Sequence, residues 1–497
     1  MTARTHPAPI RHPDCFFIDG QWARPSGPSK IDVYDSCTEE RLVSVAEAQA
    51  PDIERAVDAA RRAFDEGPWP RLSHTERADY LKAIARETRE RGADMARVWT
   101  LESGVIHALS SVTASQLAGA WDYYAGLAQT YPFIERPKPA AGGDGGILLR
   151  EPVGVVAAII PWNAPGPMIT YKAAPALLAG CTIIIKASPE APGLAYIFAE
   201  ICEKVGLPSG VVNILTADRQ VSELLVRHPG VDKVTFTGST AAGRRIASIC
   251  GERIARCTLE LGGKSAAVIL DDYDVELAAK IIASRAPLVT GQTCGSLTRM
   301  VVSRGRHDAL VDALSARFRS IKVGDPFDAD TQMGPLAMKR QRDRVEGYIA
   351  SGKAEGATLA AGGARPAHLD RGYFIEPTVF GNVDNRSTIA QEEIFGPVLS
   401  VIPADSEAHA VAIANDTIYG LNNSVFTNDV ERAYAVARRL RSGTVGHNSM
   451  GPDFSIAFGG FKQSGLGREG GVEGLLPFLE VKAVLLERAP SAVAAKA

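Results

Sequence analysis

Short apolar runs alternate with amphipathic stretches through the middle of the chain. The runs are rich in β-branched residues, end at Gly or Pro turns, and are typical of strands buried in a parallel sheet. The first four are VVAAII, TIIIK, VVNIL and KVTFTG, which begin at Val153, Thr182, Val211 and Lys233. Helical periodicity fills the gaps at residues 193–205 and 221–227. This alternation predicts a doubly wound α/β domain.

A second series of the same kind follows. Its predicted strands are AAVIL, RMVVS and PVLSVI, which begin at Ala266, Arg299 and Pro397. Its predicted helices cover residues 275–286, 306–318 and 429–440. We expect a second sheet with its own core, because 497 residues exceed what one hydrophobic core usually supports.

Segments outside these two series predict further helices and a small accessory sheet. Residues 51–64 and 73–91 have helical periodicity, with Asp52 and Ser73 as candidate N-caps. The segments ILLREP and FLEVKAVLLE are remote in sequence but both favour strands, so we expect them to pair. An exposed sheet edge of this kind commonly pairs with another subunit, which favours a homodimer or homotetramer.

Composition excludes several classes of protein. Hydrophobic residues are 45% and charged residues 22% of the chain, which is ordinary for a folded globular protein. The 54 basic and 57 acidic residues are dispersed along the chain, so nucleic acid is not an expected partner. We expect neither secretion nor membrane insertion, because no apolar run approaches the roughly 20 residues that span a bilayer.

The seven cysteines are scattered and never spaced as Cys-x-x-Cys, which argues against a disulfide framework and against a zinc ribbon. A cytoplasmic protein without a metal site is therefore expected. A cysteine is usually a small buried hydrophobe. Cys294 differs in its setting, because GQTC places it just after a glycine and between two helical patterns, where backbone N–H groups could face a substrate.

A carboxylate ends an apolar strand in ELGGKS. The two glycines after Glu260 allow a sharp turn and the close approach of another group. Glu260 is either a solvated acid at a strand end or, near a thiol in a partly apolar cleft, a general base whose pKa burial raises towards the working pH.

Two further turns suit ligand binding. In KVTFTGSTAAG the chain passes from a strand through Gly238 and Ser239 into a helix, whose N-terminus can hold phosphate. The spacing is not the Gly-x-Gly-x-x-Gly fingerprint, and a plain strand, turn and helix is the alternative. In PWNAPG, Asn163 follows a predicted strand and either stabilises the turn or donates an amide N–H to a developing oxyanion.

Taken together, these segments resemble the aldehyde dehydrogenase superfamily, in its NAD(P)-dependent, non-acylating branch. The ordered set is PWN, TIIIKAS, FTGST, ELGGKS, GQTC, EEIFGPV and FGGFKQSGLGRE, within a resemblance that runs from about Phe16 to Glu487. Glu260 precedes Cys294 by 34 residues, as the family pattern expects.

The resemblance implies a catalytic role for five residues. Cys294 would be the nucleophile, and Glu260 the base that activates the deacylating water. Asn163 and the backbone N–H of Cys294 would form the oxyanion hole. Lys172 and Glu469 match a pair that relays a proton from the base, with a structural ion pair as the alternative.

The resemblance also implies the cofactor contacts. Lys186 and Glu393 match residues that hydrogen-bond ribose hydroxyls, and Phe395 matches a position beside the nicotinamide ribose. Gly238 with Ser239 matches the pyrophosphate turn. Trp162 has no assigned role.

The chain departs from the family pattern at one cofactor position. Three residues after Lys186 the family commonly has a glutamate, which disfavours a 2′-phosphate, whereas this chain has Pro189. The next residue, Glu190, could reach the same hydroxyls. We therefore expect NAD as the cofactor, with NADP tolerated.

The implied fold is α/β of the aldehyde dehydrogenase type, in three parts. A Rossmann-type cofactor domain would take residues 14–124 and 150–258, and an α/β catalytic domain residues 259–459. Residues 125–149 and 471–490 would form a small β extension for oligomerisation.

The implied activity is oxidation of an aldehyde to the acid through a thiohemiacetal and a thioester on Cys294. The expected tunnel is mostly apolar and has no evident arginine to clamp a carboxylate, which favours aliphatic, aromatic or terpenoid aldehydes. Its expected lining is Ala164, Pro167, Met168, Tyr171, Leu288, Thr293, Phe454 and Phe458. The alternative functions are transfer of the acyl group to coenzyme A, transfer of the acyl group to phosphate, and cofactor binding without catalysis. Glu260 argues against the first of these.

Overall fold

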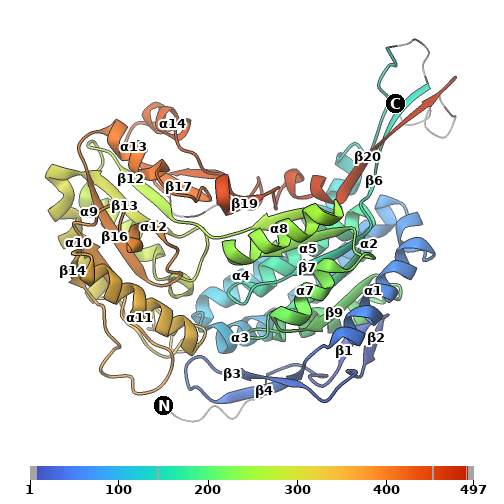
Figure 1. Ribbon diagram of the computed structural model, residues 1–497, viewed down its shortest axis with the longest axis horizontal. Coiled ribbons are helices and arrows are strands. Elements are labelled where there is room, and N and C mark those ends of the chain that lie inside the picture. The colour runs from blue at the N-terminus through green and yellow to red at the C-terminus, as the bar shows by residue number, and fades with distance from the viewer. Residues whose placement is uncertain are drawn as a thin grey trace.

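The computed structural model describes residues 8–140, 142, 145–449, 451, 453–488 and 490. Residues 141, 143, 144 and 489 of the predicted extension, and residues 1–7 at the N-terminus, lie outside this part. Two helix-covered sheets stand side by side, and a slender arm made of β6 and β20 projects from the body (Figure 1).

The first sheet has eight strands in the order β19-β11-β10-β7-β8-β9-β1-β2. Its centre is parallel and consists of β7 (Val155–Ile159), β8 (Thr182–Ala187), β9 (Val212–Thr216), β10 (Lys233–Thr237) and β11 (Arg256–Glu260). Its edges are antiparallel and consist of β1 (Phe16–Ile18), β2 (Gln21–Ala23) and β19 (Gly465–Leu466). The strand β11 crosses the domain boundary expected at residues 258 and 259.

Helices cover both faces of this sheet. One face carries α2 (His74–Glu90), α3 (Gly92–Ser103), α4 (His107–Thr130), α5 (Pro165–Ala179) and α6 (Gly193–Val205). The other carries α1 (Ala50–Asp65), α7 (Arg219–Arg227) and α8 (Thr240–Arg253). Val156 and Ala158 of β7 pack into the first core, and Val155 and Ala157 into the second. Because both faces are buried, the strand has no polar side and its sequence is a continuous apolar run.

The second sheet has seven strands in the order β14-β15-β16-β13-β12-β17-β18. The strands are β12 (Ser265–Ile269), β13 (Leu297–Ser303), β14 (Thr358–Ala361), β15 (Thr378–Gly381), β16 (Val398–Ala404), β17 (Asn422–Phe426) and β18 (Thr444–His447). Its helices are α9 (Val275–Arg285), α10 (His307–Arg319), α11 (Lys339–Ala354), α12 (Thr388–Gln391), α13 (Glu407–Asn415) and α14 (Val430–Ala437). Within the described residues, none of the helices is long and apolar enough to cross a membrane.

Two small sheets complete the fold. The arm joins β5 (Ile134–Glu135), β6 (Gly145–Pro152) and β20 (Leu479–Leu486), and β6 pairs with β20 in antiparallel register. This pairing confirms the accessory sheet expected from ILLREP and FLEVKAVLLE. A separate hairpin joins β3 (Lys30–Tyr34) to β4 (Arg41–Ala46).

One of the two predicted helix caps is confirmed and the other is wrong. The Ser73 side chain accepts a hydrogen bond from the Glu76 N–H at the start of α2. The N-cap of α1 is Gln49, and Asp52 lies three residues inside the helix. Its carboxylate accepts from the Gln49 N–H at 2.9 Å and from the Ser26 N–H at 2.9 Å. Asp52 therefore satisfies the N–H of the N-cap residue from within the first turn and ties Ser26 to the start of the helix.

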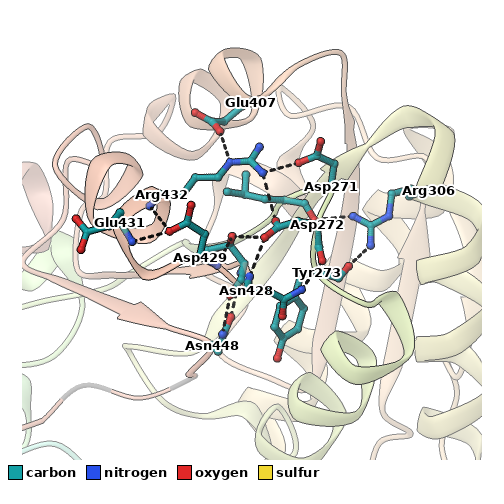
Figure 2. Close-up of polar contacts among 12 residues, drawn as sticks. Asp271, Asp272, Tyr273, Arg306, Glu407, Asn428, Asp429, Glu431, Arg432 and Asn448 are labelled. Atoms are coloured by element: carbon teal, nitrogen blue, oxygen red, sulfur yellow. Dashed lines mark hydrogen bonds and ion pairs between the residues drawn. The ribbon is translucent and has the colours of Figure 1, made fainter.

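A polar network holds α13 and α14 against the end of β12 (Figure 2). The Arg432 guanidinium lies 2.7 Å from Asp271, 3.3 Å from Asp272 and 3.0 Å from Glu407. The Asp272 carboxylate also accepts from the Thr427 hydroxyl at 2.6 Å. One arginine thus joins the turn after β12 to two helices that come much later in the chain.

Candidate active site

Three parallel strands of the first sheet bring predicted site residues to one edge. Asn163 follows β7, Lys186 lies in β8, and Glu260 ends β11. The carboxyl ends of parallel strands share one edge, where ligands bind in open α/β sheets. Cys294 and Glu393 precede β13 and β16 of the second sheet. The candidate site therefore lies between the two sheets.

The loop before Cys294 is strained and closely packed. Val289 and Thr290 have φ values of 53° and 54°, which β-branched residues rarely adopt. Gly291 has a φ of 71°, and a Cβ there would lie 2.4 Å from the carbonyl carbon of Gly396. The glycine of GQTC is therefore required by both conformation and contact.

Buried polar side chains compensate for this strain. The Thr290 hydroxyl lies 3.0 Å from the carbonyl oxygens of Gly334 and Pro335, to which it can donate. The Gln292 side chain, which is fully buried, accepts from the Ala337 N–H at 3.0 Å and donates to the Val289 carbonyl at 2.9 Å. These bonds fix the position of the sulfur two residues later.

The two glycines of ELGGKS allow three segments to meet. A Cβ on Gly262 would lie 2.4 Å from a carboxylate oxygen of Glu393, and a Cβ on Gly263 would lie 2.4 Å from the carbonyl oxygen of Cys294. The Gly263 N–H donates to Glu393 at 3.0 Å. Any side chain here would separate the strand that ends in Glu260 from the loop that carries the sulfur.

The ionisable groups of the site have displaced pKa values. Burial raises the pKa of the Cys294 thiol to about 12, and the charges of Glu393 and Glu260 add to this effect. Burial raises the pKa of Glu393 to about 7. Burial, then the charge of Glu469, raises the pKa of Glu260 well above its ordinary value. A protonated thiol therefore lies among carboxyl groups basic enough to act near neutral pH.

Glu260 faces a second buried carboxylate. It is 1% exposed, and neither of its oxygens has a hydrogen-bond partner in the described part of the chain. A Cβ on Gly459 would lie 2.7 Å from one of these oxygens. The residue before this glycine, Phe458, exchanges backbone hydrogen bonds of 2.6 and 2.7 Å with Glu469. This bridge holds Glu469 beside the base.

The predicted pair of Lys172 and Glu469 is in contact. Their side chains form a short, fully buried ion pair, and the Lys172 ammonium also donates to the Thr235 hydroxyl at 3.2 Å. The second carboxylate oxygen of Glu469 has no partner among the described residues. Glu260, Glu469 and Lys172 are thus three buried ionisable side chains, of which Glu469 and Lys172 are in direct contact.

Asn163 is oriented by the cysteine loop. Its side-chain amide nitrogen donates to the Gln292 backbone carbonyl at 2.8 Å. Its backbone carbonyl accepts from the Trp99 indole N–H at 2.9 Å. An asparagine amide has two N–H groups. One is used to hold the side chain, which leaves the other for an oxygen atom near the sulfur.

Two adjoining cavities on the first sheet have the lining expected of a dinucleotide site. The larger, of about 650 Å³, is lined by residues that include Lys186, Glu190 and Gly238. The second, of about 440 Å³, contains Ser239 and Cys294 together with Trp162, Glu260, Glu393 and Phe395. Ser239 is the N-cap of α8, so the N-terminus of that helix borders this cavity, and its free N–H groups could bind an anion there.

The lining of the larger cavity contains an ion pair for which the sequence has no local signal. Glu190 lies 2.5 Å from Arg340 of α11 and accepts from the Ser188 hydroxyl. Burial acts to raise the pKa of Glu190, but Ser188 and Arg340 outweigh it and hold the pKa below its ordinary value. Burial lowers the pKa of Lys186 to about 8. The pair joins the two sheets across the cavity.

A third cavity, of about 320 Å³, reaches the sulfur from the other side. Seven of the eight expected residues line it; Tyr171 instead stacks on the Phe454 ring at 4.6 Å. Its lining is Trp99, Asn163, Ala164, Pro167, Met168, Thr237, Arg285, Leu288, Val289, Thr293, Cys294, Gly295, Ser296, Gly451, Phe454 and Phe458. The expectation that no arginine reaches the tunnel is wrong, because Arg285 is in this lining.

Comparison with known proteins agrees with this geometry. The sequence profile of the Aldehyde dehydrogenase family matches residues 22–484. A geranial dehydrogenase of Castellaniella defragrans is 43% identical over 95% of this chain and 98% of its own length.

Solved structures give the same result. An aldehyde dehydrogenase of Mycobacterium tuberculosis in complex with NAD+ is 44% identical, with a TM-score of 0.93 over 95% of this chain and 98% of its own. A variant of aldehyde dehydrogenase C from Pseudomonas syringae, in complex with NAD+ and octanal, is 38% identical, with a TM-score of 0.93 over 97% of this chain and 99% of its own. The chain therefore belongs to the aldehyde dehydrogenase family and is an NAD(P)-dependent enzyme that oxidises aldehydes.

Proposed function

We propose that the chain oxidises apolar aldehydes to carboxylic acids through a covalent intermediate on Cys294. The observation that carries this proposal is that the polar cofactor cavity and the apolar cavity share Asn163, Thr237 and Cys294. An aldehyde in the apolar cavity therefore meets the sulfur where the cofactor cavity begins. The octanal named with the Pseudomonas syringae structure and the geranial named for the Castellaniella relative support an apolar occupant.

The residues of the two polar cavities suit a dinucleotide. Lys186 and Glu393 would bind ribose hydroxyls, and the N-terminus of α8 at Ser239 would bind the pyrophosphate. Phe395 and Trp162, whose rings are 5.4 Å apart, would wall the nicotinamide side. The bound nicotinamide ring supplies the hydride acceptor of the reaction.

Activation of the nucleophile requires a base, because the Cys294 thiol is protonated at neutral pH in this environment. Glu260 is suited to accept the proton, since its carboxylate oxygens are buried and free of hydrogen bonds among the described residues. The sulfur then bonds to the aldehyde carbon and the carbonyl oxygen becomes an oxyanion. The free N–H of Asn163 and the backbone N–H of Cys294 stabilise this charge.

Two further steps, hydride loss and hydrolysis, complete the reaction. Loss of the hydride with its electron pair restores the carbon–oxygen double bond and leaves a thioester on Cys294. Glu260 then takes a proton from water, whose oxygen attacks the thioester carbon, and the sulfur leaves as the acid forms. We propose that Glu469 and Lys172 carry the protons taken up by Glu260 away from the site.

The chain is expected to have three functional parts. We propose that residues 14–124 and 150–258 bind the cofactor, that residues 259–459 supply the nucleophile, and that the arm assembles subunits. On the arm, Val481, Leu485 and Leu486 are 60%, 75% and 45% exposed, which is costly for apolar side chains in water. Light scattering should therefore report a dimer or tetramer, and a monomer would contradict this role.

A panel of aldehydes with NAD, with and without coenzyme A, tests the proposed activity. Medium-chain aldehydes should give NADH and the free acid at a rate that coenzyme A does not change. Cys294→Ser should abolish turnover yet retain NAD binding, because a hydroxyl is a far weaker nucleophile at neutral pH. Dependence on coenzyme A, or substantial turnover by the serine variant, would contradict the proposal.

A further inference from the structure

The apolar cavity has a charged group at its outer end. Among the residues that line the cavity, Trp99 and Met168 are buried, whereas Arg285 and Gly451 are exposed. Arg285 therefore lies where the cavity meets solvent. A substrate whose carbonyl carbon lies at Cys294 would bring its far end to this arginine.

Arg285 is the only charged residue among the described residues of this lining. Asp453, which precedes the lining residue Phe454 in sequence, is not itself in the lining. Its carboxylate accepts from the Ser455 N–H at 2.8 Å and from the Ser455 hydroxyl at 2.6 Å. Within the described part of the chain, the Arg285 side chain has no hydrogen bond or ion pair. Its guanidinium is therefore available to a ligand.

The position of Arg285 relative to the sulfur is fixed by the fold. Arg285 is the last residue of α9, and the short helix Leu288–Gly291 leads directly to the cysteine loop. Thr290 and Gln292 anchor that loop, as described above. A cation in the last turn of a helix also interacts favourably with the helix dipole. That interaction alone does not explain why Arg285 lines the cavity.

We propose that Arg285 selects among aldehydes by the charge of the end remote from the carbonyl. This inference rests on the proposed oxidation of apolar aldehydes and narrows it. The favoured class has an apolar body and a remote hydrogen-bond acceptor or carboxylate, which the planar guanidinium binds. Aldehydes with a remote quaternary ammonium group are disfavoured by repulsion, although the stacked rings of Phe454 and Phe458 would otherwise attract a cation.

Three straight-chain aldehydes of equal length, ending in methyl, carboxylate or trimethylammonium, test this proposal. Arg285→Gln should lower kcat/KM for the carboxylate aldehyde by about two- to fivefold and raise it for the cationic aldehyde by a similar factor, because the site is exposed. The change in kcat/KM should come from KM, since the contact between Arg285 and the remote group of the substrate is equally present in the ground state and the transition state. The methyl aldehyde should change by less than about twofold.

Two further variants provide matched controls. Arg285→Lys keeps the charge and should keep the order of the three substrates. Lys280→Gln removes a positive charge from the exposed side of the same helix, outside the lining, and should leave all three values unchanged. About 0.5 M salt should reduce the effect of Arg285→Gln, because exposed charges are then screened.

The outcomes separate this inference from the proposed function. Equal changes for all three aldehydes in Arg285→Gln, or the same pattern in Lys280→Gln, would overturn the role of Arg285. A wild-type enzyme that oxidises the carboxylate aldehyde but not the methyl aldehyde would instead overturn the apolar class while supporting charge selection. Oxidation of none of the three would overturn both.

Discussion

Replacement of Glu190 and replacement of Arg340 should move cofactor preference in opposite directions. The two side chains form an ion pair of 2.5 Å and both line the cavity that contains Lys186. The 2′-phosphate that distinguishes NADP from NAD carries close to two negative charges. Glu190→Gln removes a repelling carboxylate and releases the guanidinium, whereas Arg340→Gln removes the attracting cation and leaves the carboxylate alone.

The size of the effect follows from distance and exposure. Two unit charges about 4 Å apart interact by about 4 kcal/mol at an effective dielectric constant of about 20. The Arg340 side chain is 66% exposed and that of Glu190 is 20% exposed, so solvent screening removes most of this energy. We expect about 1.4 kcal/mol for each substitution, which is about a tenfold change in the ratio of kcat/KM for NADP to that for NAD.

Steady-state kinetics with both cofactors measures this ratio. Glu190→Gln should raise it about tenfold, Arg340→Gln should lower it about tenfold, and the double variant should return close to the wild-type value. Lys339→Gln is the control, because Lys339 is adjacent in sequence, pairs with Asp343 at 2.7 Å and is not in the cavity lining. A shift of both variants in the same direction would refute the reasoning, as would an equal response of the Lys339 variant.

Three further substitutions test the chemistry and the packing. Glu260→Gln should slow both the NADH burst and steady turnover by about 10²- to 10⁴-fold at neutral pH, with partial recovery of the burst at alkaline pH; an undiminished burst would show that another group deprotonates Cys294. Glu469→Gln removes a charge that raises the pKa of Glu260, so Glu260 stays deprotonated to lower pH and the acid limb of the rate profile should move to lower pH. An acid limb at the wild-type position would show that Glu469 does not influence the titration of Glu260. Gly263→Ala should cost about 1–3 kcal/mol in thermal unfolding and lower kcat, because its Cβ meets the Cys294 carbonyl at 2.4 Å. Gly347→Ala, where a Cβ meets nothing within 4 Å, should be neutral or stabilising.

Local sequence patterns predicted the elements that depend on local signals. The helix α6 begins and ends as expected, because Gly206 adopts a φ of 71° and closes it. The strand β8 could be predicted from its run of β-branched residues, and all of its residues are buried in the structure. Asp52 was misplaced because an acid is common both at the N-cap, where it accepts from N–H groups inside the helix, and at the third helical position, where it accepts from the N-cap N–H.

The contacts between remote segments had no local signal. Arg340 lies in a run of charged residues at the start of α11, and such a run usually indicates a solvated helix face. Arg285 ends α9, where a basic residue is common for reasons of the helix dipole. Both reach cavities only because the second sheet is placed against the first. Trp99, which donates to the Asn163 backbone carbonyl, was missed because the two residues are 64 positions apart and no local pattern links them.

The edges of the eight-stranded sheet have a consequence for the making of the protein. One edge is formed by β1 and β2, which precede the parallel strands in the chain, and the other by β19, where Leu259 pairs with Leu466 and Glu260 with Gly465. Domains generally begin to fold while the ribosome is still extending the chain. The parallel centre of this sheet can form early, but the edge of β11 stays open until β19, which follows every strand of the second sheet in the chain, has been translated. The growing polypeptide therefore has an unpaired strand edge, a known route to aggregation, through the whole synthesis of the second sheet.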